Sequence, residues 1–590
     1  MHDRLLTTHI AKRPMRFHAI ATDFDGTIAH NNDVDDATLA ALERAKKSGR
    51  KLLLVTGREL PDLQLVFPRL DLFDLVVVEN GAVLFNPQSK EVSILAEPPL
   101  PKFVAELRAH KVSPLSTGYV IVATHEPHHI EVLKIIHEYG LELQVIFNKG
   151  SVMVLPSGVN KATGLAAALA ELALSPHNAV AIGDAENDHA FMRLCECSAA
   201  VANALPAVKE TADLVLDKAR GEGVVELVDR LIANDLFDLK TLSRHHILIG
   251  ETDDINEYPL DPAGHGVLVA GTSGSGKSTI TTSIMEGLAD AGYQVLVIDP
   301  EGDYETLDFA NHIGNPTQAP QQDAITDALK DPIRSIVVNL LGVPLDDRPT
   351  FFAELLPHIL QEKARTGRPH WLVIDETHHL LPHGPSSVAL APLLPERGIL
   401  FITVHPGDVE PMTMANVDTL LLIGGQPADT LKGFCKATGE NEPVCPAVQG
   451  NKLPTGDAMV WRRGSPEAIV IHMKQPRTVR KRHSRKYAEG NLGPEGSFYF
   501  RGPNGKLNLK APNLQVFLHL ADGVDDETWE YHRKNGDFSK WVRAQIKDES
   551  LADELVQIEV DHVAKPNDTR AAVRVSIEAL YTLPADIASG

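Results

Sequence analysis

A glycine-rich turn between an apolar strand and a helix without an internal breaker constrains this sequence more than any other feature. The stretch HGVLVAGTSGSGKSTITTSIMEGL fits the pattern G-x-x-x-x-G-K-S from Gly271 to Ser278. Glycines in such a turn let backbone N–H groups converge on phosphate at the helix N-terminus, while the lysine reaches the outer phosphates and the serine hydroxyl faces Mg²⁺. The sequence therefore predicts an ATP site with these binding residues: Gly271, Gly274, Gly276, Lys277, Ser278 and Thr279.

A later strand indicates what this site does with ATP. The stretch RPHWLVIDETHHLLP reads as a buried strand that ends in Asp375 and Glu376. An aspartate there completes the Mg²⁺ shell with Ser278, and a following glutamate is well placed to orient the attacking water. Hydrolysis needs that water, whereas transfer to a bound hydroxyl does not. The pair therefore favours an ATPase over a kinase.

Two aspartates follow the first apolar run of the chain. The stretch RFHAIATDFDGTIA reads as a short buried strand stopped by a turn, and Asp23 and Asp25 project together beyond its carboxyl end. Ligands bind at that edge of open parallel sheets. Two carboxylates in one place are costly unless a cation or a catalytic task compensates them. The pair therefore marks a candidate catalytic site.

Three later segments add polar groups at strand ends or at a helix start. Thr56 follows the strand of KLLLVTGR, and Lys161 opens the helix of GVNKATGLAAALA. The strand of NAVAIGDAENDHAFM ends before Asp184 and Asp188. Together with the first strand, these ends offer a nucleophile, a hydroxyl, an ammonium and further carboxylates.

This order of motifs resembles the haloacid dehalogenase superfamily of phosphohydrolases, in particular the branch that acts on small phosphorylated metabolites and carries its cap between the second and third motifs. The resemblance covers roughly residues 15–235. It implies that Asp23 attacks phosphorus and that Asp25 acts as acid toward the leaving group and then as base toward water. Thr56 and Lys161 would hold the phosphoryl oxygens. A magnesium site would be formed by these groups: Asp23, the carbonyl of Asp25, Asp184 and Asp188, with Asn187 in support.

The stretches DPEGDY and VIDETHHLLP, together with the phosphate loop, resemble the HerA/FtsK group of P-loop ATPases. That group forms hexameric rings and typically pumps or processes DNA. The resemblance covers roughly residues 242–470. It implies that Glu376 is the catalytic base, that His405 senses the γ-phosphate, and that Arg397 is a finger reaching a neighbour's nucleotide. A homohexamer with DNA as a candidate partner is the corresponding expectation.

The length of 590 residues exceeds what one core can hold, so several domains are expected. The expected fold class is α/β, with a Rossmann-like core and α/β cap followed by a RecA-like parallel sheet and a small, mainly helical module. The predicted boundaries are 1–240 for the first domain with its cap at about 81–155, 241–473 for the ATPase domain, 474–486 for a basic linker and 487–590 for the last module.

Charge and hydropathy exclude some classes of protein. The net charge of −23 argues against a surface built for static DNA binding, although a local basic channel remains open. We find no apolar run of spanning length, and the N-terminal stretch, with its scattered charge, does not read as a secretory signal. We therefore expect a cytoplasmic protein without a membrane partner.

The last module concentrates aromatic rings, which suit either a compact helical core or a platform for stacking bases. The core is favoured because the segment is not basic. The rings belong to these residues: Phe498, Phe500, Trp529, Tyr531, Phe538 and Trp541.

Three hypotheses for the whole chain follow. The leading one is a bifunctional enzyme, a magnesium-dependent phosphatase fused to a ring-type ATPase. The second is a polynucleotide kinase-phosphatase, which would act on phosphorylated DNA ends instead of a phosphorylated small molecule. The third is a regulatory or defence assembly in which ATP or DNA gates the phosphatase. The Asp375 and Glu376 pair argues against the second hypothesis.

Overall fold

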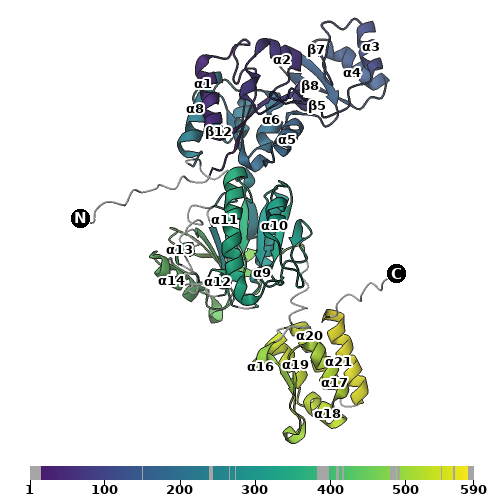
Figure 1. The fold of residues 1–590 in the computed structure, drawn as a ribbon, viewed down its shortest axis with the longest axis vertical. Coiled ribbons are helices and arrows are strands. Elements are labelled where there is room, and N and C mark those ends of the chain that lie inside the picture. The colour runs from purple at the N-terminus through teal and green to yellow at the C-terminus, as the bar shows by residue number, and fades with distance from the viewer. Residues whose placement is uncertain are drawn as a thin grey trace, which may run out of the picture. The chain divides into compact units, whose positions relative to one another are not determined.

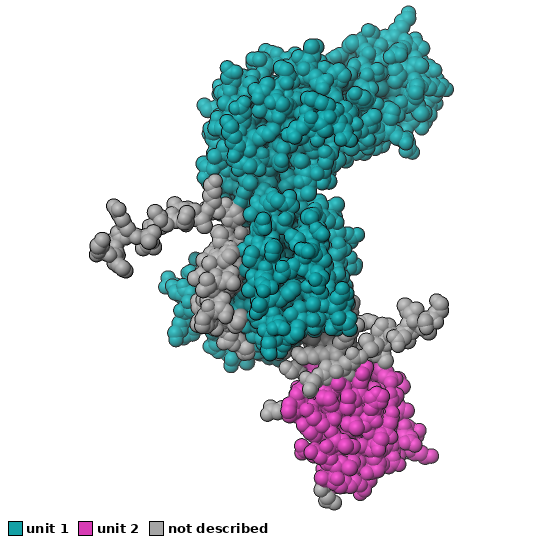
Figure 2. All heavy atoms as spheres, viewed as in Figure 1, with its two compact units in different colours: residues 1–477 teal, residues 478–590 magenta. Residues whose placement is uncertain are grey.

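The computed structural model describes the following residues: 15–148, 150–237, 239, 243–254, 256–264, 266–272, 274–381, 397–404, 406, 409, 411–414, 417–478, 487, 492–546, 548–561 and 565–581. The chain divides into two compact units, residues 1–477 and residues 478–590 (Figure 2). This division falls within the predicted linker 474–486, of which residues 479–486 lie outside the described residues. Across the described ranges, no helix combines the length and the apolar character needed to cross a membrane.

The first domain is built on an eight-stranded sheet with the order β12-β11-β10-β1-β2-β3-β4-β5. The strands from β12 to β3 pair in parallel, and β4 and β5 add an antiparallel edge. The strands are β1 Ala19–Thr22, β2 Lys51–Val55, β3 Leu75–Val78, β4 Val83–Phe85, β5 Val92–Ile94, β10 Ala179–Gly183, β11 Cys197–Ala200 and β12 Leu214–Val215.

Helices cover both faces of this sheet, which explains why its central strands are buried throughout. Helices α1 and α8 pack together on one face, and α5 and α6 pack together on the other (Figure 1). The helices are α1 Asp36–Lys47, α2 Leu60–Val66, α5 Lys161–Glu171, α6 His189–Leu194, α7 Pro206–Thr211 and α8 Arg220–Asn234.

The cap is a four-stranded antiparallel sheet, β6-β7-β9-β8, with two helices packed on it. Its elements are α3 Pro101–Ala109, β6 Ser116–Thr117, β7 Val122–His125, α4 His129–Glu138, β8 Leu143–Asn148 and β9 Ser151–Pro156. We predicted that the cap begins near residue 81, but β4 and β5 extend the core sheet and the cap begins after them. The alternating pattern of a short strand is the same in either sheet, so the sequence did not separate them.

The central domain contains an eleven-stranded sheet with the order β14-β13-β23-β22-β21-β15-β20-β19-β16-β18-β17. The pairs from β21 to β17 are parallel, which confirms the predicted parallel sheet, and the remaining strands are antiparallel. The strands are β13 Ile247–Glu251, β14 Glu257–Leu260, β15 Gly266–Gly271, β16 Val295–Asp299, β17 Ala310–Ile313, β18 Ser335–Asn339, β19 Trp371–Ile374, β20 Ile399–Thr403, β21 Thr419–Ile423, β22 Asp457–Arg462 and β23 Ile469–Met473.

Two hydrophobic clusters lie on the two faces of this sheet. Helix α9 packs into one of them, and α10, α11 and α14 pack into the other. The helices are α9 Lys277–Asp290, α10 Gln322–Ala328, α11 Arg348–Thr366, α12 Thr377–Leu380, α13 Pro411–Met414 and α14 Pro427–Thr438.

The second unit is mainly helical, as predicted, and includes a two-stranded antiparallel sheet. Its elements are α16 Gly493–Gly496, β24 Phe498–Phe500, β25 Leu509–Ala511, α17 Leu514–Gly523, α18 Asp526–Lys534, α19 Asp537–Trp541, α20 Glu549–Glu559 and α21 Pro566–Tyr581. Five of the six aromatic residues named above are buried in one core, and only Tyr531 among them is exposed. Buried rings cannot stack on bases, so the core interpretation is confirmed.

Candidate active sites

Parallel pairing brings the predicted phosphate-handling residues of the first domain to one edge of the sheet. Asp23 follows β1, Thr56 follows β2 and Asp184 follows β10. Strand β1 pairs in parallel with both β2 and β10, so the carboxyl ends of all three strands meet. All three side chains are buried at this edge.

Lys161 lies between two aspartates of this edge. Its Nζ donates to Asp23 Oδ1 and to Asp188 Oδ1, each at 2.6 Å, and the side chain is buried. Burial alone would lower the pKa of Lys161, but the charges of Asp188 and Asp23 raise it above its usual range. Asn160 caps α5 by accepting hydrogen bonds from the first turn, which fixes where the helix begins. Lys161 is therefore held as an ammonium beside the predicted nucleophile.

Asp188 organises the turn after β10. Its Oδ1 accepts from Lys161, and its Oδ2 accepts from the backbone N–H groups of Asp184 and Ala185 at 2.8 and 2.9 Å. A Cβ on Gly183 would lie 2.7 Å from the Asp188 carboxylate, so only glycine fits there. Both carboxylate oxygens of Asp188 thus serve to position Lys161 and the turn that carries Asp184.

The residues at this edge fit a divalent cation. Asp23, Asp184 and Asp188 each offer a carboxylate oxygen, and these atoms lie within 4.8 Å of one another. Burial, together with repulsion from Asp188, raises the pKa of Asp23 to about 7, although Lys161 lowers it. One ammonium does not balance three buried carboxylates, and oxygen ligands are those that Mg²⁺ prefers. The predicted set of Asp23, the carbonyl of Asp25, Asp184 and Asp188 would hold it, and Asp188 also uses both oxygens in hydrogen bonds to Lys161 and to the turn.

Magnesium binding is expected to release protons near neutral pH. Because the pKa of Asp23 is raised to about 7, part of the protein carries a protonated Asp23 there, and Mg²⁺ must displace that proton. The affinity for Mg²⁺ should therefore fall as pH falls through about 7 and level off above it. Calorimetric titration of Mg²⁺, without nucleotide, in buffers of different ionisation enthalpy counts the protons.

Two variants separate this site from any other source of protons. Asp23→Asn should abolish the proton release, whereas Asp71→Asn, which changes an exposed carboxylate bonded to Arg69, should leave it unchanged. Equal proton release in Asp23→Asn and the wild type would show that Asp23 does not meet the cation.

Asp25, the predicted acid and base, is held by an arginine that sequence reasoning missed. Arg58 donates through Nε to Asp25 Oδ2 at 2.7 Å and through Nη2 to Asp25 Oδ1 at 2.6 Å. The Asp25 side chain is 42% exposed, so it borders the open side of the site. Both carboxylate oxygens of Asp25 accept hydrogen bonds from Arg58. The arginine follows Thr56 by two residues, and its place after a strand end was the available signal.

Glu79 joins the cap to the core beside this edge. It follows β3, is fully buried, and its carboxylate accepts from the N–H groups of Tyr119, Val120 and Ile121 at 2.8, 2.7 and 2.9 Å. The next residue, Asn80, accepts a hydrogen bond from the Asn187 amide at 3.1 Å. The cap segment before β7 is therefore fixed to the core. No sequence signal marked Glu79, because its partners lie about forty residues away along the chain.

The glycine-rich turn of the central domain has the predicted form. Gly271 ends β15, and α9 begins at Lys277. Gly274 and Gly276 have φ values of 75° and 101°, which favour glycine. Lys277 Nζ donates to the Gly271 carbonyl oxygen at 3.0 Å, so the lysine lies along the loop. Ser278 and Thr279 follow in the first turn of the helix.

Several carboxyl groups face this loop. Asp375 follows β19 and is buried, and burial together with the charge of Asp303 raises its pKa well above the usual range. The Ser278 hydroxyl donates to Asp303 Oδ2 at 3.3 Å. Burial lowers the pKa of Lys277, while Glu376 and Asp375 oppose that shift. A surplus of carboxyl groups beside a phosphate loop suits a nucleotide bound with Mg²⁺. The sequence pointed to Asp375 and Glu376, but it did not assign a role to Asp303.

Glu376 stands at the end of the strand in an unusual backbone conformation, with φ at 42°. Its Oε2 lies 3.4 Å from His378 Nδ1, and that ring nitrogen lies 3.2 Å from the Thr403 hydroxyl. Thr403 ends β20, the strand between β15 and β19, so Glu376 is connected to the strand next to the phosphate loop.

The structure gives Arg397 a different contact from the predicted one. Arg397 precedes β20, which pairs in parallel with β15, and it therefore lies at the amino edge of the sheet, opposite the phosphate loop. Its guanidinium lies 3.5 Å from the ring centroid of Phe237 in the first domain. A finger toward a neighbour's nucleotide would have to give up this contact. His405, the predicted sensor, lies outside the described residues.

Comparison with known families agrees with this geometry in both domains. A family model described as haloacid dehalogenase-like hydrolase matches residues 20–126 and 120–228. A second one, described as the central domain of the helicase HerA, matches residues 257–353. The chain joins a haloacid dehalogenase-like hydrolase domain to a HerA-type ATPase domain. It is therefore a hydrolase, and below we call the two parts the phosphatase domain and the ATPase domain.

Curated relatives match the phosphatase domain over most of their own length. Phosphoglycolate phosphatase 2 of Saccharolobus solfataricus is 28% identical over 220 residues, which are 37% of this chain and 93% of the relative. Phosphoglycolate phosphatase of Methanothermobacter thermautotrophicus is 28% identical over 221 residues, which are 36% of this chain and 98% of the relative. A solved haloacid dehalogenase-like hydrolase from Bacteroides thetaiotaomicron is 19% identical, covers 36% of this chain and 99% of its own, and has a TM-score of 0.33.

Proposed function

We propose that the phosphatase domain hydrolyses phosphate monoesters of small molecules by a magnesium-dependent mechanism with Asp23 as nucleophile. The observation that carries the proposal is the position of Asp23, whose carboxylate is buried at the strand edge, bonded to Lys161 and next to Asp184 and Asp188. The relatives are named for phosphoglycolate, so small phosphorylated acids are the first substrates to test.

The proposed reaction has two steps, and Asp23 and Asp25 act in both. In the first, an Asp23 oxygen forms a bond to phosphorus while the bond to the leaving-group oxygen breaks, and Asp25 gives that oxygen a proton. In the second, water attacks the phosphoryl group on Asp23, Asp25 takes a proton from the water, and phosphate leaves with the Asp23 carboxylate restored. Lys161 and Thr56 bind the phosphoryl oxygens. Magnesium, when bound, supplies positive charge that lets the two anions approach.

The ATPase domain hydrolyses ATP at the loop from Gly271 to Ser278, with Glu376 orienting and deprotonating the attacking water. Asp375 and Ser278 are the groups that would bind the magnesium of the nucleotide. The position of Glu376 directly after Asp375, at the end of a buried strand beside that loop, supports hydrolysis over transfer to a second substrate. A ring of six copies and contact with DNA belong to this proposal, by analogy with the named helicase.

One set of assays distinguishes the hypotheses. The purified chain is given sugar phosphates, nucleotides, phosphoglycolate and DNA with a 3′ phosphate, and phosphate release is measured. In parallel, γ-labelled ATP is supplied with a 5′-hydroxyl oligonucleotide, and the mass of the assembly is determined with and without ATP. We expect release from a small phosphorylated acid and ATP hydrolysis without labelled DNA. Label on the oligonucleotide would establish the kinase-phosphatase alternative in its place, and a phosphatase rate that depends on ATP or DNA would establish the gated assembly.

A further inference from the structure

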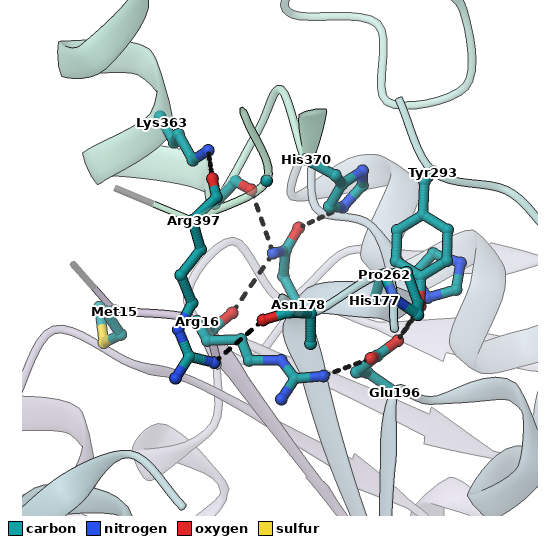
Figure 3. A pocket seen from close by; sticks show the side chains of 13 residues that line it. Met15, Arg16, His177, Asn178, Glu196, Pro262, Tyr293, Lys363, His370 and Arg397 are labelled. Atoms are coloured by element: carbon teal, nitrogen blue, oxygen red, sulfur yellow. Dashed lines mark hydrogen bonds and ion pairs between the residues drawn. The ribbon is translucent and has the colours of Figure 1, made fainter. Parts of the chain in front are cut away.

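The phosphatase and ATPase domains meet through residues that precede strands of their two sheets. A cavity of about 70 Å³ lies at this junction (Figure 3). Asn178, which precedes β10, donates to the Gly367 carbonyl at 3.3 Å and lies 3.2 Å from His370 Nε2. Arg368 donates to the Ala173 carbonyl at 2.8 Å. These contacts join the two domains within the first unit.

Glu196 lies at the centre of the junction and is buried. It forms an ion pair with Arg16, lies 2.6 Å from His177 Nδ1, and accepts a hydrogen bond from the Tyr293 hydroxyl at 2.9 Å (Figure 3). Burial alone would raise its pKa, but the hydrogen bond from His177 and the charge of Arg16 hold the pKa of Glu196 well below its usual range. Glu196 is therefore a buried carboxylate that connects three segments, one of them in the ATPase domain.

His177 has an acceptor at each ring nitrogen. Its Nδ1 faces Glu196 Oε2, and its Nε2 lies 2.8 Å from the carbonyl oxygen of Ala291. A carbonyl oxygen and an ionised carboxylate can only accept, so both nitrogens must donate, and only the imidazolium has two N–H groups. The ring also stacks on Tyr293, with centroids 3.8 Å apart and an interplanar angle of 21°. The contacts thus hold His177 as a cation.

The carbonyl that His177 binds belongs to the end of the phosphate-loop helix. Ala291 is the C-cap of α9, whose first residue is Lys277. A cation at a helix C-terminus is favourable, because unsatisfied carbonyl groups gather there. Tyr293, which follows two residues later, is fixed by the same Glu196. The far end of the helix that presents Lys277 and Ser278 to ATP is therefore held by the phosphatase domain.

We propose that His177, a residue of the phosphatase domain, is a positioning residue for ATP hydrolysis. As a doubly donating cation between Glu196 and Ala291, it fixes the C-terminal end of α9 and with it the direction in which Lys277 and Ser278 point. A rigid helix transmits a tilt at one end to the other, and small errors in placement cost a catalytic site much of its rate. The inference rests on the proposed ATPase function.

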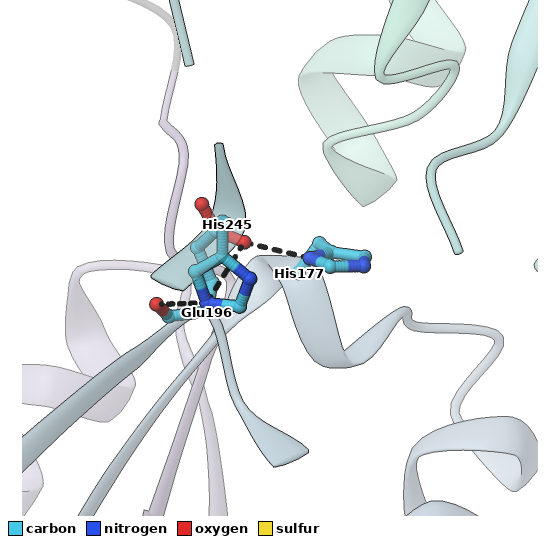
Figure 4. Close-up of side chains that lie close together, drawn as sticks. All are labelled: His177, Glu196 and His245. Carbon is cyan, nitrogen blue, oxygen red and sulfur yellow. Dashed lines mark hydrogen bonds and ion pairs between the residues drawn. The ribbon is translucent and has the colours of Figure 1, made fainter. Parts of the chain in front are cut away.

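The same side chains could be read as a metal site, since ligand atoms of His177, Glu196 and His245 lie within 4.8 Å of one another (Figure 4). Their hydrogen bonds favour the ion pair instead. His245 Nε2 lies 3.0 Å from the backbone oxygen of Glu196, so that nitrogen carries a proton and has no lone pair for a metal. Arg16 already supplies positive charge to the carboxylate.

The test compares ATP hydrolysis with hydrolysis of p-nitrophenyl phosphate in the full chain. In His177→Ala, kcat/KM for ATP should fall about tenfold, while the phosphatase rate stays within about twofold of the wild type. The matched control is His245→Ala, which removes a neighbouring ring that contacts Glu196 but not α9, and which should leave both rates unchanged. Equal losses of both activities in His177→Ala, or no loss of ATP hydrolysis, would overturn the proposal.

Two conservative variants separate positioning by a hydrogen-bond donor from simple packing. His177→Gln keeps an N–H donor for the Ala291 carbonyl and should recover part of the ATPase rate that His177→Ala loses, whereas His177→Leu only fills space and should not. Equal ATPase rates in His177→Gln and His177→Leu would mean that the ring only fills space. Absence of ATP hydrolysis in the wild type would instead refute the proposed function.

Discussion

Replacing Asp23 by asparagine is expected to abolish phosphatase activity, with a rate at least about 10⁴-fold lower. An amide is not a nucleophile toward phosphorus, and no described side chain beside it offers a second free carboxylate in the same contact with Lys161. Asp188 also bonds Lys161, but its other oxygen is occupied by the amides of the turn at Asp184 and Ala185. Initial rates with the best substrate of the screen measure the loss.

The ATPase activity of the same chain serves as the control for Asp23→Asn. ATP hydrolysis in Asp23→Asn should equal that of the wild type, because Asp23 is not part of the junction between the domains. Rapid acid quench with labelled substrate should trap a phosphorylated wild-type protein and no labelled Asp23→Asn. Phosphatase activity retained in the variant would place the nucleophile elsewhere.

Replacing Glu376 by glutamine is expected to lower ATP hydrolysis by about 10²- to 10³-fold while ATP still binds. Glutamine keeps the size of the side chain but cannot take a proton from water. The carboxyl group also contributes to the charge around Lys277, so removing it should not weaken the attraction of the loop for phosphate. Steady-state turnover and binding of a fluorescent ATP analogue measure the two effects separately.

Two further variants serve as controls for Glu376→Gln. Lys277→Ala should lose ATP binding as well as turnover, because its ammonium reaches the outer phosphates. Glu354→Gln, on the exposed side of α11, should match the wild type in both assays. Unchanged turnover in Glu376→Gln would exclude it as the base and leave hydrolysis to another group near the loop.

The sequence predicted the two strand-end sites because their residues are read locally. Asp23, Thr56 and Asp184 each follow an apolar run directly, and parallel pairing of β1 with β2 and β10 then brings them together without further information. The phosphate loop is equally local, since its glycines and Lys277 lie within one turn. Sites of this kind can be predicted from the local sequence pattern together with the rule that ligands bind at the carboxyl ends of parallel strands.

The residues that the sequence missed act across long chain separations. Arg58 reaches Asp25, 33 positions away, and Glu196 meets Tyr293, 97 positions away. A single arginine or glutamate in a loop has no periodicity that would reveal such a partner. Arg397 shows the converse problem, because the resemblance to the HerA/FtsK group implied a finger, whereas the guanidinium of Arg397 lies 3.5 Å from the ring centroid of Phe237. Only the tertiary structure pairs these side chains.

Both proposed catalytic centres lie at the carboxyl edges of their sheets, while the junction uses residues that precede strands, such as Asn178 before β10 and His370 before β19. The two proposed centres therefore lie at the sheet edges opposite the junction. Because the proposed centres and the junction lie at opposite edges, substitutions that alter a substrate site and substitutions that alter the junction affect different residues. Cap and loops at the carboxyl edges can be remodelled for a new substrate without disturbing the contacts that keep the two enzymes fused.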